Sequence, residues 1–98
     1  MITSKQRAYL RAMANTMETI LIVGKSGIRA EIIKQSDDAL TAREIFKGKV
    51  LETADENVHE IATFLAEKTH ADIVQIIGTK FVLYRKNNKN PQIILPKK

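Results

Sequence analysis

The hydrophobic positions of the chain recur with two periods, which predict three helices and four strands. Apolar residues spaced by three and four positions indicate helices at residues 4–15, at residues 28–40 and after Asp55. Thr3 or Ser4 can cap the first helix, and Asp55 can cap the third. Continuous or alternating apolar runs indicate strands at residues 19–23, 44–51, 73–77 and 81–85.

The order of these elements predicts an α/β domain. Two strand–helix–strand units favour parallel neighbouring strands joined by right-handed crossovers. The short link Gly78-Thr79-Lys80 between the last two strands favours an antiparallel hairpin. We therefore expect one domain, residues 1–98, with the order α-β-α-β-α-β-β and a mixed four-stranded sheet. Residues 86–98 are predicted to form a basic, mobile tail, in which residues 92–95 can dock as a short extra strand.

The link between the first strand and the second helix carries the clearest chemical pattern. Gly24, Lys25, Ser26 and Gly27, here called the glycine turn, separate an apolar strand from a helical pattern. Free amides at the start of a helix favour an anion, and residues without a Cβ let a sugar-phosphate chain approach the backbone. Lys25 adds positive charge, and Arg29, which opposes the helix dipole, suits a bound anion. The pattern predicts contact with a nucleic-acid backbone; the alternative is that the glycines only serve the turn.

Charge is divided unevenly along the chain. The net charge of +5 is made of +4 in residues 1–29, −5 in residues 30–79 and +6 in residues 80–98. Basic segments of this kind are typical of a surface that binds a polyanion. We expect the basic residues of both ends to gather around the glycine turn while the acidic middle faces elsewhere. The alternative is that both ends are solubilising tails.

Further basic and aromatic residues are candidates for the same surface. Lys5, Arg7 and Arg11 can form a basic edge on the first helix, for which an ordinary solvated face is the alternative. Tyr84 and Arg85 end the last strand and can stack on a base or bind a phosphate. The alternative there is a tyrosine at the core edge followed by a solvated arginine.

The second strand carries lysines on one side. Alternation directs Lys47 and Lys49 away from the core. Such lysines can contact phosphate, but they also protect the edge of a sheet from aggregation, and this second interpretation is the one we favour. Gly48 stands between them and predicts a bulge or a close contact with a helix.

Several chemistries have no pattern in the sequence. There is no cysteine, and His59 and His70 have no surrounding ligand motif, so we expect no metal site and no cofactor. Residues 24–26 resemble part of a nucleotide-binding loop, but Thr19 stands where that loop needs glycine. Ser26 shows no catalytic spacing to a histidine and an acid. No apolar run reaches the roughly 20 residues of a membrane span, and the start of the chain lacks a secretory pattern. We therefore expect a cytoplasmic protein that is not an enzyme.

Several motifs together carry a resemblance to a known family. The glycine turn is accompanied by Val74-Gln75-Ile76-Ile77-Gly78, Phe81-Val82-Leu83-Tyr84-Arg85, Ile94-Leu95-Pro96 and the opening Thr3-Ser4-Lys5-Gln6-Arg7. The set resembles the CRM domain, named for chloroplast RNA splicing and ribosome maturation, and in particular its stand-alone bacterial form, the YhbY family. The resemblance covers nearly the whole chain.

The resemblance implies an RNA-binding protein with a fold similar to the C-terminal domain of translation initiation factor three. It implies that the partners are ribosomal RNA and the ribosomal particle in precursors of the large subunit, whose assembly the protein assists. In that family the glycine turn is compared with the GxxG loop of KH domains, which clamps RNA backbone. The residues carried over are Gly24, Lys25, Ser26 and Gly27 and, at basic positions near the turn, Lys5, Arg7, Lys80 and Arg85.

We expect a monomer with no membrane partner. The alternative function is a protein-interaction module whose basic face binds an acidic ribosomal or other protein.

Overall fold

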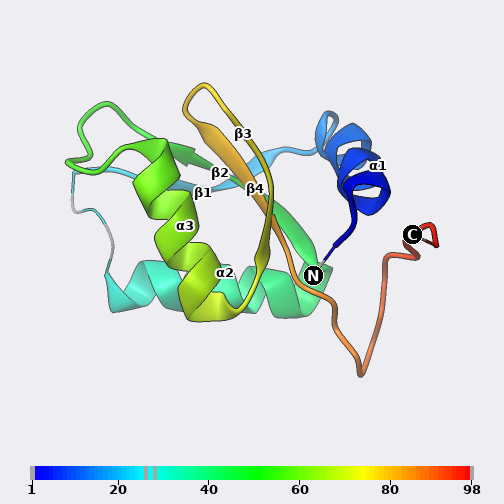
Figure 1. The fold of residues 1–98 in the computed structure, drawn as a ribbon. Helices are drawn as coiled ribbons and strands as arrows, with labels where there is room; N and C mark the ends of the chain where they lie inside the picture. Colours follow the sequence, from blue (N-terminus) through cyan, green and yellow to red (C-terminus); the bar gives the residue numbers. More distant parts are fainter. Residues whose placement is uncertain (1, 26, 28, 98) are drawn as a thin grey trace.

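The sheet has four strands in mixed orientation. The computed structural model describes residues 2–25, 27 and 29–97. Its strands are β1 (Thr19–Val23), β2 (Ile45–Val50), β3 (Asp72–Ile77) and β4 (Lys80–Tyr84), which lie side by side in the order β1-β2-β4-β3 (Figure 1). β1 and β2 are parallel, whereas β4 is antiparallel to both of its neighbours. The predicted α/β fold with a mixed sheet is therefore confirmed.

Helices lie on both faces of the sheet, and each face has its own apolar core. α2 (Ala30–Arg43) and α3 (Val58–Thr69) cover one face, over a core that includes Phe46 and Phe81. α1 (Ser4–Ala14) packs on the other face. α1 covers only part of that face, near the end of the sheet where β1 begins (Figure 1).

The starts of α1 and α3 follow the capping-box pattern. Thr3 caps α1, because its side chain accepts from the Gln6 amide at 3.2 Å and the Gln6 side chain accepts from the Thr3 amide at 3.0 Å. The predicted Asp55 cap of the third helix is wrong. Asn57 caps α3 instead, since Glu60 stands three residues further on and completes the reciprocal pair of hydrogen bonds.

α2 differs from its prediction at both ends. It begins at Ala30, and Arg29 is its N-cap residue, without a capping hydrogen bond from its side chain. Ile28, the predicted first residue, lies outside the described residues. The helix continues to Arg43 and ends where Glu44 adopts the left-handed conformation, with φ of 66°.

Gly48 is required by the close approach of a neighbouring strand and not of a helix. Gly48 in β2 lies directly opposite Phe81 in β4, and a Cβ at Gly48 would lie 2.7 Å from Cε1 of Phe81. The missing side chain leaves this space to the ring, which meets the ring of Phe46 edge-on at a centroid distance of 6.1 Å. The irregular register nearby lies on β1, between Thr19 and Leu21.

The C-terminal tail is attached to the domain by Glu44. The carboxylate of this fully buried residue accepts hydrogen bonds from the amides of Asn87 at 2.7 Å, Gln92 at 2.6 Å and Ile93 at 2.7 Å. The predicted extra strand at residues 92–95 is wrong, because two of its amides donate to this carboxylate instead of to a neighbouring strand. The mobility of the tail stays a prediction.

A methyl group at Gly48 would displace the Phe81 ring from the core. We expect Gly48→Ala to lower the free energy of unfolding by roughly 1–3 kcal/mol, the usual cost of overpacking. Denaturant unfolding measures the change. Gly24→Ala is the control, since a Cβ at Gly24 would lie 3.4 Å from Leu51 Cδ1, an ordinary contact. Equal stability of the two variants would contradict the packing role of Gly48.

Acid should release the tail. Burial acts to raise the pKa of Glu44, but the three tail amides and the charge of Lys86 outweigh it and hold that pKa below its ordinary value of 4.5. A lowered pKa in the folded state means that the stabilisation is present above pH 4.5 and is lost as the pH falls through the lowered value. The NMR shifts of the Asn87 and Gln92 amides should report this release.

Glu44→Gln should show released-tail shifts already at neutral pH. Glu67→Gln, which changes an exposed carboxylate on α3, should leave those shifts unchanged. Tail shifts that are the same in Glu44→Gln and in the natural protein would count against the attachment.

Candidate nucleic-acid interface

The glycine turn lies at the end of the sheet away from α1 (Figure 1). It directly follows β1, and the amide of Gly27 donates to the carbonyl oxygen of Gly24 at 2.9 Å. Lys25 is exposed in this turn. Ser26, another predicted site residue, lies outside the described residues.

The two glycines serve different purposes. Gly27 has a φ of +65°, and a Cβ there would lie 3.0 Å from Oε1 of Glu56. Gly27 is buried, so glycine is needed for backbone conformation and for the packing of Glu56, and not for the approach of a ligand. Gly24 is half-buried and has ordinary contact distances. Gly24 therefore remains the candidate for the predicted close approach of a sugar-phosphate chain, and that approach stays a prediction.

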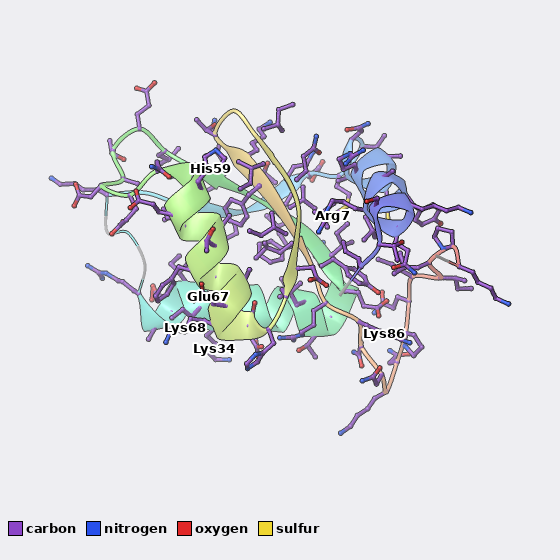
Figure 2. All side chains as sticks on the ribbon, in the orientation of Figure 1. Arg7, Lys34, His59, Glu67, Lys68 and Lys86 are labelled. Atoms are coloured by element: carbon purple, nitrogen blue, oxygen red, sulfur yellow. The ribbon has the colours of Figure 1, made fainter. Side chains whose placement is uncertain are left out.

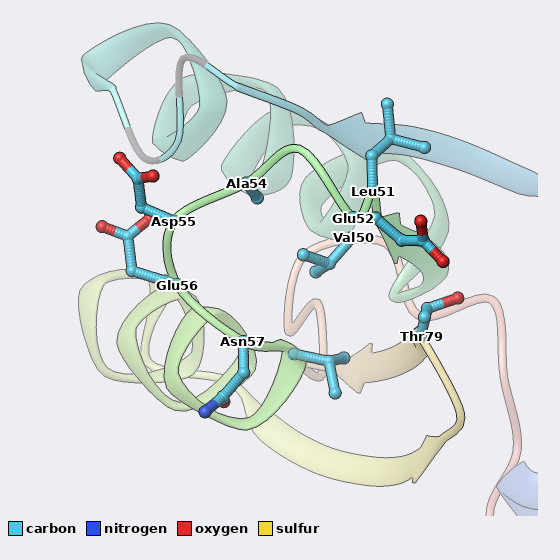
Figure 3. Close-up of a pocket in the computed structure, with 9 residues that line it drawn as sticks. Val50, Leu51, Glu52, Ala54, Asp55, Glu56, Asn57 and Thr79 are labelled. Carbon is cyan, nitrogen blue, oxygen red and sulfur yellow. The ribbon is translucent and has the colours of Figure 1, made fainter.

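The segment that follows β2 brings carboxylates to the glycine turn. Figure 3 shows a cavity of about 320 Å³ lined by residues 50–52, residues 54–58 and Thr79. Asp55 and Glu56 point from its rim toward the link between β1 and α2. Oε1 of Glu56 is enclosed and has no hydrogen-bond partner among the described residues. The prediction that the acidic middle faces away from the turn is therefore wrong on this side, because the loop before α3 returns to it.

The predicted gathering of both basic ends around the turn is also wrong. Lys80 lies at the glycine-turn end, because it is opposite Lys49 near the end of β2. β4 then runs antiparallel to β2 and brings Tyr84 opposite Ile45, at the other end of the sheet. Arg85 follows Tyr84 and lies about 17 Å from Lys80 along an extended strand.

Arg85 joins three elements at that far end. Its Nη1 donates to Asp37 Oδ1 at 2.7 Å and to the carbonyl oxygen of Thr69 at 2.8 Å. Its Nη2 donates to Thr41 Oγ1 at 2.9 Å and to the Asp37 carbonyl oxygen at 3.2 Å. The guanidinium therefore connects the end of β4 to α2 and α3, and both of its Nη groups are engaged within the protein.

Tyr84 is a core residue. Its side chain is 3% exposed and belongs to the core under α1, so its ring is not presented to a base. Burial raises the pKa of the Tyr84 phenol, and the charges of Glu44 and Asp72 raise it further. The phenol therefore stays protonated at neutral pH.

The basic residues of α1 lie with Arg85 at the far end and not with Lys25. The Arg7 Nε donates to the carbonyl oxygen of Ile73 near the start of β3, at 3.2 Å, and Figure 2 shows Arg7 between α1 and the sheet. Lys5 and Arg11 are exposed on the same helix. Arg29, in contrast, is exposed just before α2, close to the glycine turn in the chain.

Sequence reasoning did not include Lys47 and Lys49 among the candidate residues. Lys47 and Lys49 were interpreted as protection of a sheet edge, but β2 lies between β1 and β4 and is not an edge strand, so that interpretation is wrong. Both are half-exposed on the α1 face, near Lys80. A prediction of the strand order could have identified these lysines as candidates. A parallel neighbour on one side and a hairpin strand on the other place β2 inside the sheet.

The comparison with protein families agrees with this architecture. Residues 2–85 match the CRS1 / YhbY (CRM) domain family. The chain belongs to this family. The resemblance inferred from the glycine turn and the motifs of the last two strands is confirmed.

CRM relatives that match nearly the whole chain carry RNA-binding names. The chain is 40% identical over 96 residues to the "probable RNA-binding protein YqeI" of Bacillus subtilis, covering 98% of this chain and all of that protein. It is 29% identical to an "RNA-binding protein" of Haemophilus influenzae, covering 99% of this chain and 97% of that one. The solution structure of the hypothetical protein SAV1595 from Staphylococcus aureus has a TM-score of 0.81 at 42% identity and covers 98% of this chain and 100% of its own.

The described ranges contain neither a membrane-spanning helix nor a metal-binding group of side chains. No helix there is long and apolar enough to cross a bilayer. No group of three or more histidine, aspartate or glutamate side chains there could hold a metal ion.

Proposed function

We propose that this CRM-domain protein binds RNA without catalysing a reaction. Its family membership and the RNA-binding names of its relatives support the proposal. The observation that carries it is the exposed cationic turn at one end of the sheet, where Lys25 follows the half-buried backbone of Gly24.

The proposed site at the turn binds backbone phosphate. Lys25 in the turn and Arg29 after it supply exposed positive charge, and Lys80 adds charge at the same end of the sheet. Gly24 leaves the backbone accessible, whereas Gly27 sets the shape of the turn. Ser26 is included in the proposed site because it belongs to the glycine-turn motif in the sequence.

A second group of basic residues lies at the far end of the sheet. Lys5, Arg7 and Arg11 belong to α1, which packs at that end. We propose that they contact a separate stretch of the same RNA, on the order of 17 Å away along the strands. Tyr84 and Arg85 support this group by fixing the end of β4 rather than by touching RNA.

We propose that the RNA is ribosomal RNA in precursors of the large ribosomal subunit, bound in the cytoplasm by a monomer that assists assembly of the particle. The resemblance to the YhbY family supports this target. Crosslinking in cells followed by sequencing of the bound RNA should enrich large-subunit precursor sequences. Reads distributed over all cellular RNA would contradict the target and leave RNA binding itself standing.

Lys25→Ala should weaken RNA binding because it removes a phosphate contact. If about five phosphates are bound, the logarithm of affinity should fall against the logarithm of salt with a slope between about −3.5 and −4.5. Removing one contact should make that slope shallower by about 0.7–0.9. Fluorescence anisotropy of a labelled RNA hairpin across a salt series measures both quantities.

Glu60→Ala is the control, because Glu60 is an exposed acidic residue of α3 whose carboxylate accepts from the Asn57 amide in the cap of that helix. It should keep the affinity and slope of the natural protein. A flat salt response of the natural protein would refute backbone binding. Equal losses of RNA affinity from Lys25→Ala and Glu60→Ala would contradict a specific role of the turn in binding.

A further inference from the structure

Part of the α1 face of the sheet is uncovered, because Ile22 and Ile77 on that face are 57% and 62% exposed. α1 and the tail bury Ile45, Val74, Val82 and Tyr84 on this face. Nearer the glycine turn, the side chains on the same face reach solvent. We name this region the open sheet face, and its members are Ile20, Ile22, Lys47, Lys49, Ile77 and Lys80.

The outermost row of the open sheet face places two lysines side by side. Ile22 in β1 is opposite Lys49 in β2, Lys49 is opposite Lys80 in β4, and Lys80 is opposite Ile77 in β3. Like charges directly opposite each other destabilise a sheet. A bound anion would replace this repulsion by attraction to both ammonium groups.

The protein itself does not neutralise this pair within the described ranges. The ion pairs there are Lys34–Asp38 and Arg85–Asp37, and neither lies on the open sheet face. The exposed isoleucines at the two ends of the row give the lysine stems apolar surface to lie on and reduce access of water. Less water around the ammonium groups strengthens their attraction to a partner charge.

We propose that the open sheet face binds RNA phosphates, with Lys49 and Lys80 as the main contacts and Lys47 beside them. This inference rests on the proposed function, which already includes Lys80, and extends the RNA surface from Lys80 to Lys49 and Lys47. Lys25 follows Ile22 by three residues, which is at most about 11 Å of extended chain. An RNA strand held at the turn can therefore continue over the row of lysines.

The charges around the turn favour an RNA path over the open sheet face rather than over the helix side of the turn. On the helix side of the turn, the carboxylates of Asp55 and Glu56 repel a polyanion. The members of the open sheet face include no aromatic residue for base stacking. The face therefore contacts phosphate and sugar, and its contribution to affinity is independent of base sequence.

The double variant Lys49→Gln/Lys80→Gln tests the inference. Loss of two phosphate contacts should make the salt slope shallower by about 1.4–1.8 and weaken binding on the order of tenfold at low salt. Anisotropy with two labelled RNA hairpins of unrelated sequence should show the same loss for both. The thermal unfolding midpoint should rise or stay constant, because a like-charge pair is removed, so the loss cannot come from unfolding.

The matched control is Lys34→Gln/Lys68→Gln. It removes the same charge from α2 and α3, whose side chains lie on the helical side of the molecule (Figure 2). This control should keep the affinity and the slope close to those of the natural protein. Lys25→Ala is measured in parallel to report on the turn alone.

The outcomes separate this inference from the proposed function. A loss confined to the Lys49/Lys80 variant and to Lys25→Ala supports the inference. If Lys25→Ala weakens binding and the Lys49/Lys80 variant does not, the open sheet face, Lys80 included, is not an RNA surface, although the proposed binding at Lys25 and Gly24 stands. If both double variants lose affinity equally, or if only the oligomeric state changes, the inference is also overturned. Absence of RNA binding by the natural protein would overturn both.

Discussion

Contact between Gly48 and the ring of Phe81 sets the alignment of the two inner strands. A shift of one residue would set the ring against a lysine Cβ and turn every side chain of β2 to the other face. With the alignment fixed, Lys49 stands opposite Lys80, and the amide of Leu51 reaches the carbonyl oxygen of Val23 at 2.9 Å. The alignment of Lys49 with Lys80 in the lysine row therefore depends on one missing side chain.

Much of the fold could be read from hydrophobic periodicity, because burial of one face determines that periodicity. The strand Thr19–Val23 has the predicted bounds, and the helix containing Ile61 and Leu65 has the predicted apolar face. Helix ends were less predictable. Asn57 caps α3 in place of Asp55 because Glu60, three residues after Asn57, completes the reciprocal pair of hydrogen bonds. α2 extends to Arg43 because it ends only where the backbone of Glu44 adopts the left-handed conformation.

The site was harder to predict because it depends on strand direction and on distant partners. The charge division along the sequence is real, but β4 runs away from the glycine turn, so Lys80 and Arg85 lie at opposite ends. The engagement of Arg85 by Asp37, 48 positions earlier, leaves no local signal. The same holds for Glu56, which reaches Gly27 through a loop whose course the sequence pattern does not reveal.

The carboxylate of Glu56 beside Gly27 affects which anions can bind at the turn. A free phosphate or a mononucleotide would interact with Lys25 and with this carboxylate at once, so its net binding free energy would be small. A polymer anchored at several lysines makes its later contacts intramolecularly, at a raised effective concentration, and can tolerate one repulsive position. If the turn binds RNA as proposed, this arrangement would favour a long polyanion and would keep small anions from competing for the surface.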